Sequence, residues 1–180
     1  RSAVTIGGIP LMRGFRFPPA PAQARRALGL DPLRPVLLVI GGGLGVGLQG
    51  AVARLAAHRA GWQILVATGR NAEARNALHA LPGAAGKLRI LPWTEHMEQA
   101  ICAADVVVGK PGGLTVAEVL ACGRPLLATR SLLGQENYNL RYLEEQRVGR
   151  LVAEDELPAA VGALIADAGE LASMQRRAWA

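Results

Sequence analysis

Residues 109–118, Gly-Lys-Pro-Gly-Gly-Leu-Thr-Val-Ala-Glu, combine residue types that suit a phosphorylated ligand. An apolar run ending at Val108 predicts a strand over Asp105–Val108 that leads into them, and a helix is expected over Leu114–Cys122. Two glycines at such a strand-to-helix turn let a ligand approach the backbone closely. The helix N-terminus then offers unpaired N–H groups and the positive end of the helix dipole to an anion.

Glu118 lies on the first turns of the same expected helix. Its carboxylate is close enough to accept hydrogen bonds from hydroxyl groups of a ligand whose phosphates sit at the helix N-terminus. A nucleoside diphosphate that carries a ribose or a sugar has this combination of groups. The segment therefore favours a nucleotide-binding site.

The rest of the chain alternates apolar strands with helices. Val36–Ile40 is a continuous apolar run, which is typical of a strand buried on both faces. Further strands are expected over Gln63–Ala67, Leu88–Leu91, Pro125–Thr129 and Arg150–Val152. Helices are expected over Ala22–Leu28, Leu48–Arg59, Ala72–Ala80, Glu95–Ala103, Gln135–Gln146, Leu157–Asp167 and Glu170–Ala178. This alternation predicts an α/β fold: a Rossmann-like, doubly wound parallel sheet of six strands with helices on both faces.

Ligands of such sheets bind beyond the carboxyl ends of the strands, so the loops after four strands are expected at one edge. The loop Gly41–Gly47 has five glycines in seven positions, which lets its backbone fold closely around a phosphate or sugar. The loop Pro92–Met97 offers backbone groups to a base. Gly134–Asn137 places amide and carboxylate groups at a helix start, where they suit ligand hydroxyls or act as ordinary caps.

A dinucleotide site is an alternative. Gly45, Gly47 and Gly50 form a G-x-G-x-x-G pattern, but it runs into the following helix rather than opening it. Arg70 follows the second strand where a dinucleotide site has an acidic residue. Since Arg70 is able to accept a 2′-phosphate, an NADP-dependent oxidoreductase domain remains open. That alternative leaves Glu118 without a role.

The composition narrows the function classes. With 180 residues, 51% of them hydrophobic and 4% aromatic, the chain predicts one domain with a core of Ala, Leu and Val. Its net charge of +6 suits anionic partners, but no basic block is interleaved with aromatics, so nucleic acid is not expected. Cys102 and Cys122 are expected as buried free thiols. The three histidines lack metal-ligand spacing, so no metal is expected, and no apolar run reaches the roughly 18 residues of a membrane span.

Four segments together resemble the C-terminal, donor-binding half of a GT-B-type glycosyltransferase. The similarity is to the monogalactosyldiacylglycerol synthase and processive diacylglycerol glucosyltransferase family, and to the related enzyme that adds N-acetylglucosamine to the lipid carrier of peptidoglycan. The segments are Gly7–Pro10, Gly41–Gly47, Lys110–Thr115 with Glu118, and Gly134–Asn137. They follow the order of the family over residues 4–152.

The resemblance implies a site for UDP-hexose. Gly42, Gly43 and Gly45 would lie against the diphosphate and the donor sugar, and Thr94 with its neighbours would hold the uracil through backbone atoms. The remaining donor-binding residues that the resemblance implies are Gly112, Gly113, Leu114 and Thr115 for phosphate, Glu118 for the ribose hydroxyls, and Gln135 and Glu136 for the hydroxyls of the hexose or ribose. No further cofactor is implied.

The resemblance also implies inverting transfer of a hexose to a membrane lipid such as diacylglycerol, without a metal. The lipid site and the general base would lie in an N-terminal domain that is expected to be absent from this chain, so no catalytic residue is assigned. We interpret residues 1–20 as an interdomain linker and 21–180 as the donor domain. Alone, the domain is expected to bind UDP-sugar with little transfer activity.

A cytoplasmic location is expected, with peripheral contact at the inner face of the cytoplasmic membrane also open, because Met12–Phe17 mixes apolar and basic residues. A non-catalytic sugar-nucleotide module and a sugar-nucleotide epimerase of the same architecture remain alternatives. Glucose, galactose and N-acetylglucosamine donors are all compatible with these motifs.

Overall fold

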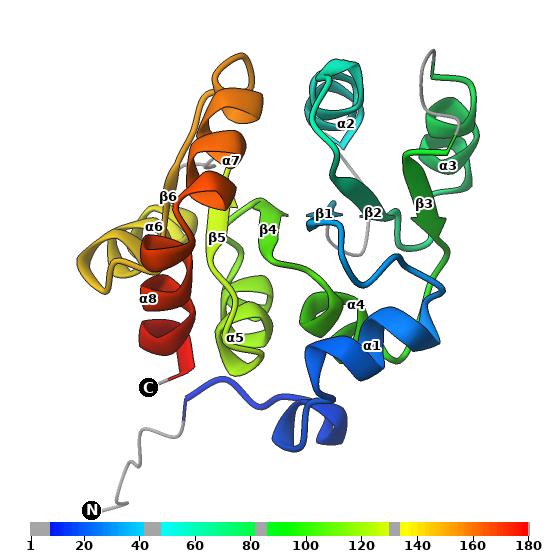
Figure 1. Ribbon diagram of the computed structural model, residues 1–180. Coiled ribbons are helices and arrows are strands. Elements are labelled where there is room, and N and C mark those ends of the chain that lie inside the picture. Colours follow the sequence, from blue (N-terminus) through cyan, green and yellow to red (C-terminus); the bar gives the residue numbers. More distant parts are fainter. Residues whose placement is uncertain (1–7, 42–47, 82–85, 130–133, 180) are drawn as a thin grey trace, which may run out of the picture.

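The computed structural model describes residues 8–41, 48–81, 86–129 and 134–179. Its centre is a parallel sheet of six strands in the order β3-β2-β1-β4-β5-β6 (Figure 1). The strands are β1 (Val36–Ile40), β2 (Gln63–Ala67), β3 (Leu88–Leu91), β4 (Val106–Gly109), β5 (Leu126–Ala128) and β6 (Gly149–Leu151). The predicted fold class is confirmed.

Helices cover both faces of this sheet. They are α1 (Pro21–Ala27), α2 (Leu48–Ala57), α3 (Ala72–His79), α4 (Met97–Ala103), α5 (Gly113–Ala121), α6 (Gln135–Glu145), α7 (Leu157–Ala166) and α8 (Ala168–Trp179), after a 3₁₀ turn, η1 (Arg13–Arg16). In Figure 1, α2, α3 and α7 lie on one side of the strands, and α1, α4 and α5 lie on the other. Each side has its own cluster of buried side chains, so every residue of β1 is buried, as its continuous apolar run predicts.

The winding of the sheet reverses at β1. Its residue Leu37 pairs with Ile64 of β2 on one side and with Val106 of β4 on the other. The chain therefore adds strands first in one direction and then in the opposite one. The carboxyl ends of β1 and β4 form the crevice where doubly wound sheets bind their ligands.

The residues before α1 pack onto the domain. Phe15, in η1, is only 5% exposed and belongs to the core beneath α4 and α5. A Cβ atom on Gly14 would lie 2.6 Å from the carboxyl carbon of Glu98, so the turn rests directly against α4. The predicted linker, residues 1–20, therefore includes a segment that is anchored to the sheet domain.

Within the described residues, no single helix has the length and apolar character needed to cross a membrane; α7 and α8 reach these limits only as a pair, by length and composition, and are bent by 95° at their junction.

Candidate functional site

A cavity of about 310 Å³ lies at the carboxyl ends of β1, β2 and β3. The loop after β3 and the first two turns of α5 form two of its walls. The lining residues are Met12, Ile40, Ala67, Gly69, Pro92, Trp93, Thr94, Glu95, Met97, Leu114, Thr115 and Glu118. The structure therefore brings four of the predicted donor-binding residues, Thr94, Leu114, Thr115 and Glu118, to one place.

The N-terminus of α5 is open toward a ligand. Gly112 is its N-cap and has no side chain with which to cap it, and the first helical hydrogen bond runs from Val116 N to Gly112 O at 2.9 Å. The N–H groups of Gly113, Leu114 and Thr115 precede that bond, so they have no partner within the helix. Three backbone donors and the helix dipole thus point toward the same anion position.

Packing within the described chain does not account for the glycine at position 112. Its backbone has ordinary dihedral angles, φ −66° and ψ 146°. A Cβ atom there would meet nothing nearer than Thr115 Oγ1 at 3.9 Å. By contrast, a Cβ atom on Gly109 would lie 2.7 Å from the carbonyl oxygen of Ile40, so Gly109 is required where β4 passes β1. The open space beside Gly112 is what a closely approaching ligand needs.

Glu118 supplies a carboxylate in the wall of this cavity. The side chain is half-buried, and among the described residues its carboxylate has no hydrogen-bond or salt-bridge partner. Burial raises the pKa of Glu118, and the negative charge of Glu98 raises it further. A largely apolar wall that carries this half-buried carboxylate suits a ligand that brings its own hydroxyl donors.

Glu98 stands behind Glu118 as a second, almost fully buried carboxylate, 6% exposed. Its Oε1 lies 3.3 Å from Nδ1 of His96, which is exposed. Analysis of the sequence alone did not assign Glu98 a role. The signal in the sequence was its place at the start of the helix that follows the Pro92–Met97 loop, in the first turn of α4.

Trp93 is a second residue that sequence reasoning did not assign to the site. It is 50% exposed and lines the cavity, and the guanidinium of Arg70 lies 4.4 Å from its ring centroid. This cation–π contact joins the loops after β2 and β3 and fixes the ring at the cavity rim. Arg70, the residue that kept an NADP site open, is thus stacked on a wall of the cavity.

The start of α6 lies beside the start of α5. Asn139 Nδ2 donates to the carbonyl oxygen of Pro111 at 2.8 Å, which ties the two helices together. Gly134 precedes α6 with a φ of +93°, and Gln135 is the first helical residue. Glu136 is half-buried and lies outside the lining of the 310 Å³ cavity. Glu136, one of the two predicted hexose contacts, therefore lies beside the start of α5 rather than in the cavity wall.

Part of the predicted site lies outside the described residues. Gly42, Gly43, Gly45 and Gly47 belong to that part. Gly50, the third glycine of the G-x-G-x-x-G pattern, lies within α2, where a Cβ atom would be 2.5 Å from Glu154 Oε2. This contact is with the end of a flexible side chain, which is able to move aside, so packing alone does not require glycine here.

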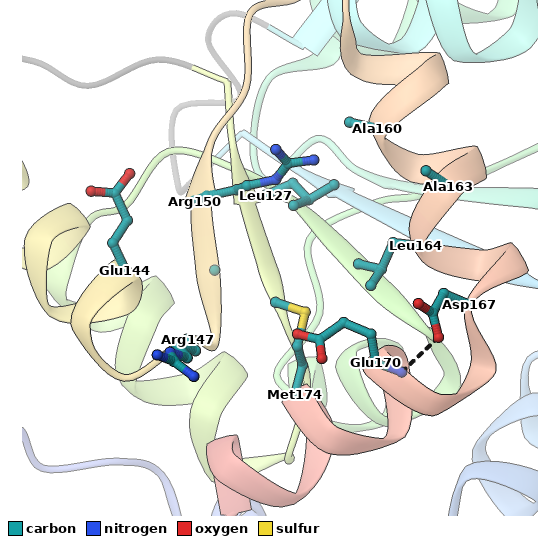
Figure 2. Close-up of a pocket in the computed structure, with 11 residues that line it drawn as sticks. Leu127, Glu144, Arg147, Arg150, Ala160, Ala163, Leu164, Asp167, Glu170 and Met174 are labelled. Carbon is teal, nitrogen blue, oxygen red and sulfur yellow. Dashed lines mark hydrogen bonds between the residues drawn. The ribbon is translucent and has the colours of Figure 1, made fainter.

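A further hollow, of about 460 Å³, lies between β6, α7 and α8 (Figure 2). Arg150 extends from β6 toward α7, while Asp167 and Glu170 lie on the opposite wall, where Asp167 Oδ1 accepts from Glu170 N at 2.9 Å. No residue of the predicted donor site lines this hollow. Within the described parts of the chain, no three His, Cys, Asp or Glu side chains are grouped so as to hold a metal ion.

Residues 36–177 match the model of the glycosyltransferase family 28 C-terminal domain. The chain belongs to this family. It is 36% identical over 147 residues to a UDP-N-acetylglucosamine–N-acetylmuramyl-(pentapeptide) pyrophosphoryl-undecaprenol N-acetylglucosamine transferase of Sorangium cellulosum, covering 78% of the chain and 34% of that protein. It is 29% identical to monogalactosyldiacylglycerol synthase 1 of Arabidopsis thaliana, covering 92% and 32%. The family 28 domain thus spans about a third of these relatives.

A third relative is the processive diacylglycerol β-glucosyltransferase of Staphylococcus aureus, 29% identical with 86% of the chain and 40% of that protein covered. Among solved structures, MurG of Acinetobacter baumannii superposes with a TM-score of 0.71 at 20% identity, covering 91% of the chain and 49% of that protein. Anabaena HepE, solved with UDP-glucose, gives 0.69 at 18% identity, covering 88% and 46%. The predicted family and its GT-B half-fold are confirmed.

Proposed function

We propose that this domain binds the UDP-sugar donor of an inverting lipid glycosyltransferase. The observation that carries the proposal is the continuity of the 310 Å³ cavity with the open N-terminus of α5. The cavity has walls for a flat base and one carboxylate for ribose hydroxyls, and the helix start has three backbone donors for phosphate. The complex of HepE with UDP-glucose, which shares this fold, supports the same ligand class.

The uracil would lie between the loop after β3, at Thr94 and Trp93, and the first turns of α5. The ribose hydroxyls would donate to Glu118. The diphosphate would accept from the N–H groups of Gly113, Leu114 and Thr115, with Gly112 leaving room for its oxygens. Gln135 and Glu136, brought close by the Asn139–Pro111 bond, would contact the hexose.

Transfer itself would leave UDP with an additional negative charge on its β-phosphate. Oriented N–H groups at a helix N-terminus stabilise such charge as it develops, and they do so without a metal ion. We infer that the domain supplies leaving-group stabilisation. The general base and the lipid acceptor, of which diacylglycerol is the leading candidate, are expected to lie in the part of the enzyme that corresponds to the rest of the relatives' length.

Calorimetric titration of the chain with UDP tests this assignment. Glu118→Ala should weaken UDP binding about ten- to a hundredfold, because it removes a hydrogen-bond acceptor that is charged and shielded from water. Glu145→Ala, an exposed carboxylate at the end of α6, is the matched control and should leave the affinity unchanged. Equal losses in both variants, or tight binding of NADP⁺ with none of UDP, would contradict the proposal.

A further inference from the structure

A third hollow, of about 540 Å³, lies at the opposite end of the sheet from the donor cavity. Helices α4 and α5 connect the two: each begins at the donor edge and ends here. Cys102, in the last turn of α4, and Cys122, the C-cap of α5, both line the hollow. Residues 18–21 and α8 contribute the other walls.

The two thiols are neighbours across the interface of α4 and α5, in the same buried cluster and on the wall of the same hollow. Each shifts the pKa of the other, although all of β4 and α5 separates them in the sequence. Both are almost fully buried, with Cys102 2% and Cys122 5% exposed. Because both also line the hollow, the hollow offers a small molecule a route toward them.

Arg124 makes this environment unusual for two buried thiols. Its side chain is 7% exposed, and its Nη2 donates to the carbonyl oxygen of Cys102 at 2.8 Å. Its Nε has no hydrogen-bond partner, and among the described residues no carboxylate lies within salt-bridge distance of it. A buried guanidinium without a carboxylate partner favours negative charge on its neighbours.

The surroundings shift the pKa values of the two thiols in opposite directions. The hydrogen bond from Cys122 lowers the pKa of the Cys102 thiol against the effect of burial, and the charge of Arg124 lowers it further. The same hydrogen bond and burial raise the pKa of Cys122. Cys102 is therefore the more acidic of the two thiols.

We propose that Cys102 and Cys122 are a peroxide-sensitive pair that closes to an intramolecular disulfide at the C-terminal ends of α4 and α5. The Cys102 thiolate attacks one oxygen of hydrogen peroxide, the O–O bond breaks, and the leaving hydroxide takes up a proton to become water. The resulting sulfenic acid is then attacked by Cys122: the S–S bond forms, the S–O bond breaks and a second water leaves. The peroxide is reduced and the two thiols are oxidised.

Mass spectrometry of the unaltered, fully reduced chain tests the proposal. After treatment with hydrogen peroxide, the chain should lose the mass of two hydrogen atoms, remain monomeric on a non-reducing gel, and recover on treatment with dithiothreitol. Because the chain has only two cysteines, such a product must be this disulfide. Its thermal midpoint should rise by roughly 5 °C. Oxygen addition without loss of hydrogen, or two thiols that remain unreacted, would overturn the proposal.

Single variants test the order of the two steps. Cys122→Ala leaves Cys102, whose sulfenic acid should persist and react with dimedone. Cys102→Ala leaves Cys122, which should react about tenfold more slowly with peroxide. Equal rates in the two variants would reject the assigned order.

The role of Arg124 has its own matched control. Arg124→Gln should slow the first step several-fold, whereas Arg176→Gln, which alters another arginine of the same hollow, should not. If Arg124→Gln does not fold, Arg124→Lys retains the charge and should keep the rate near that of the unaltered chain. A rate that is insensitive to charge at position 124 would contradict this role.

Discussion

The N-terminal and C-terminal ends of helices α4 and α5 carry different kinds of polar group. At their N-terminal ends they border an open cavity whose polar groups include backbone N–H groups and the half-buried carboxylate of Glu118. At their C-terminal ends they join two side-chain thiols and a buried guanidinium that are far apart in the sequence. The first end combines one run of consecutive residues, 112–118, with cavity walls from distant parts of the chain, whereas the second consists only of side chains that the packing of the helices brings together. The same pair of helices thus supports one site with a local component and one without.

The largest expected effect is a loss of stability at Gly109, a glycine near the candidate donor site that is needed for packing. Gly109→Ala should lower the free energy of unfolding by about 3 kcal/mol, because its Cβ atom would lie 2.7 Å from a backbone oxygen of β1 that has no room to move. Urea denaturation measures this loss. A change below about 0.5 kcal/mol would show that β4 and β1 are less closely packed than the structure indicates.

Gly112→Ala, three residues further along, should weaken ligand binding and leave stability nearly unchanged. Its Cβ atom meets only Thr115 Oγ1 at 3.9 Å, so the free energy of unfolding should change by less than about 0.5 kcal/mol. UDP affinity should nevertheless fall about ten- to a hundredfold, because the methyl group occupies the space assigned to phosphate oxygens. Calorimetry and denaturation on the same preparation separate the two effects. Undiminished UDP binding would place the diphosphate elsewhere.

The carboxylate of Glu118 should make stability depend on pH. Since the folded-state pKa is raised above the ordinary value of 4.5, the stability that Glu118 contributes is fully present below that pH and is lost as the pH rises through the raised pKa. Glu118→Gln should therefore be more stable than the unaltered chain at neutral pH, and the difference should vanish in acid. Urea denaturation over a pH series checks this, with Glu145→Gln as the exposed control. A pH-independent difference would contradict the assignment.

The smallest effect compares two tryptophans, one at each end of the helices. Trp93→Ala should weaken UDP binding about fivefold, because it removes a cavity wall that Arg70 holds in place. Trp179→Ala, which alters the wall of the thiol hollow, should leave UDP affinity unchanged and speed the reaction of Cys102 with peroxide. Trp179 lies against Gly123, with 3.1 Å between its ring and the position of a Cβ atom on that residue. If either substitution changed both the UDP affinity and the rate of the peroxide reaction, the two sites would be coupled.

Most of the fold could be predicted because its central strands, such as β1 and β4, are buried along their whole length. The bounds of Val36–Ile40, Gln63–Ala67 and Leu88–Leu91 are as predicted. The predicted helix at Glu95 begins instead at Met97, because Thr94 Oγ1 accepts from His96 N at 3.0 Å and forms a turn first. The four residues of η1 have no periodic pattern, and the anchor Phe15 is recognisable only from its burial.

Only the local geometry of the candidate site could be predicted from the sequence. Glycines before a helix and an acid in its first turns were enough to predict how residues 112–118 are arranged, while their contact with a donor stays a prediction. Trp93 could not be assigned, because a tryptophan beside a strand is as typical of a core as of a cavity rim. The thiol pair was predicted correctly as buried and free, but no pattern in the sequence indicated that Cys102 and Cys122 touch.

The strand order also governs how this domain folds. Strands β3, β2 and β1 form one half of the sheet and β4, β5 and β6 the other, and each half is built from neighbours in the chain. Only the pairing of β1 with β4 joins the halves, at contacts such as Leu38 with Val107. Closing that long loop costs more chain entropy than any other strand pairing in the sheet. The crevice that would bind the nucleotide is therefore expected to form last, when two separately collapsed halves meet.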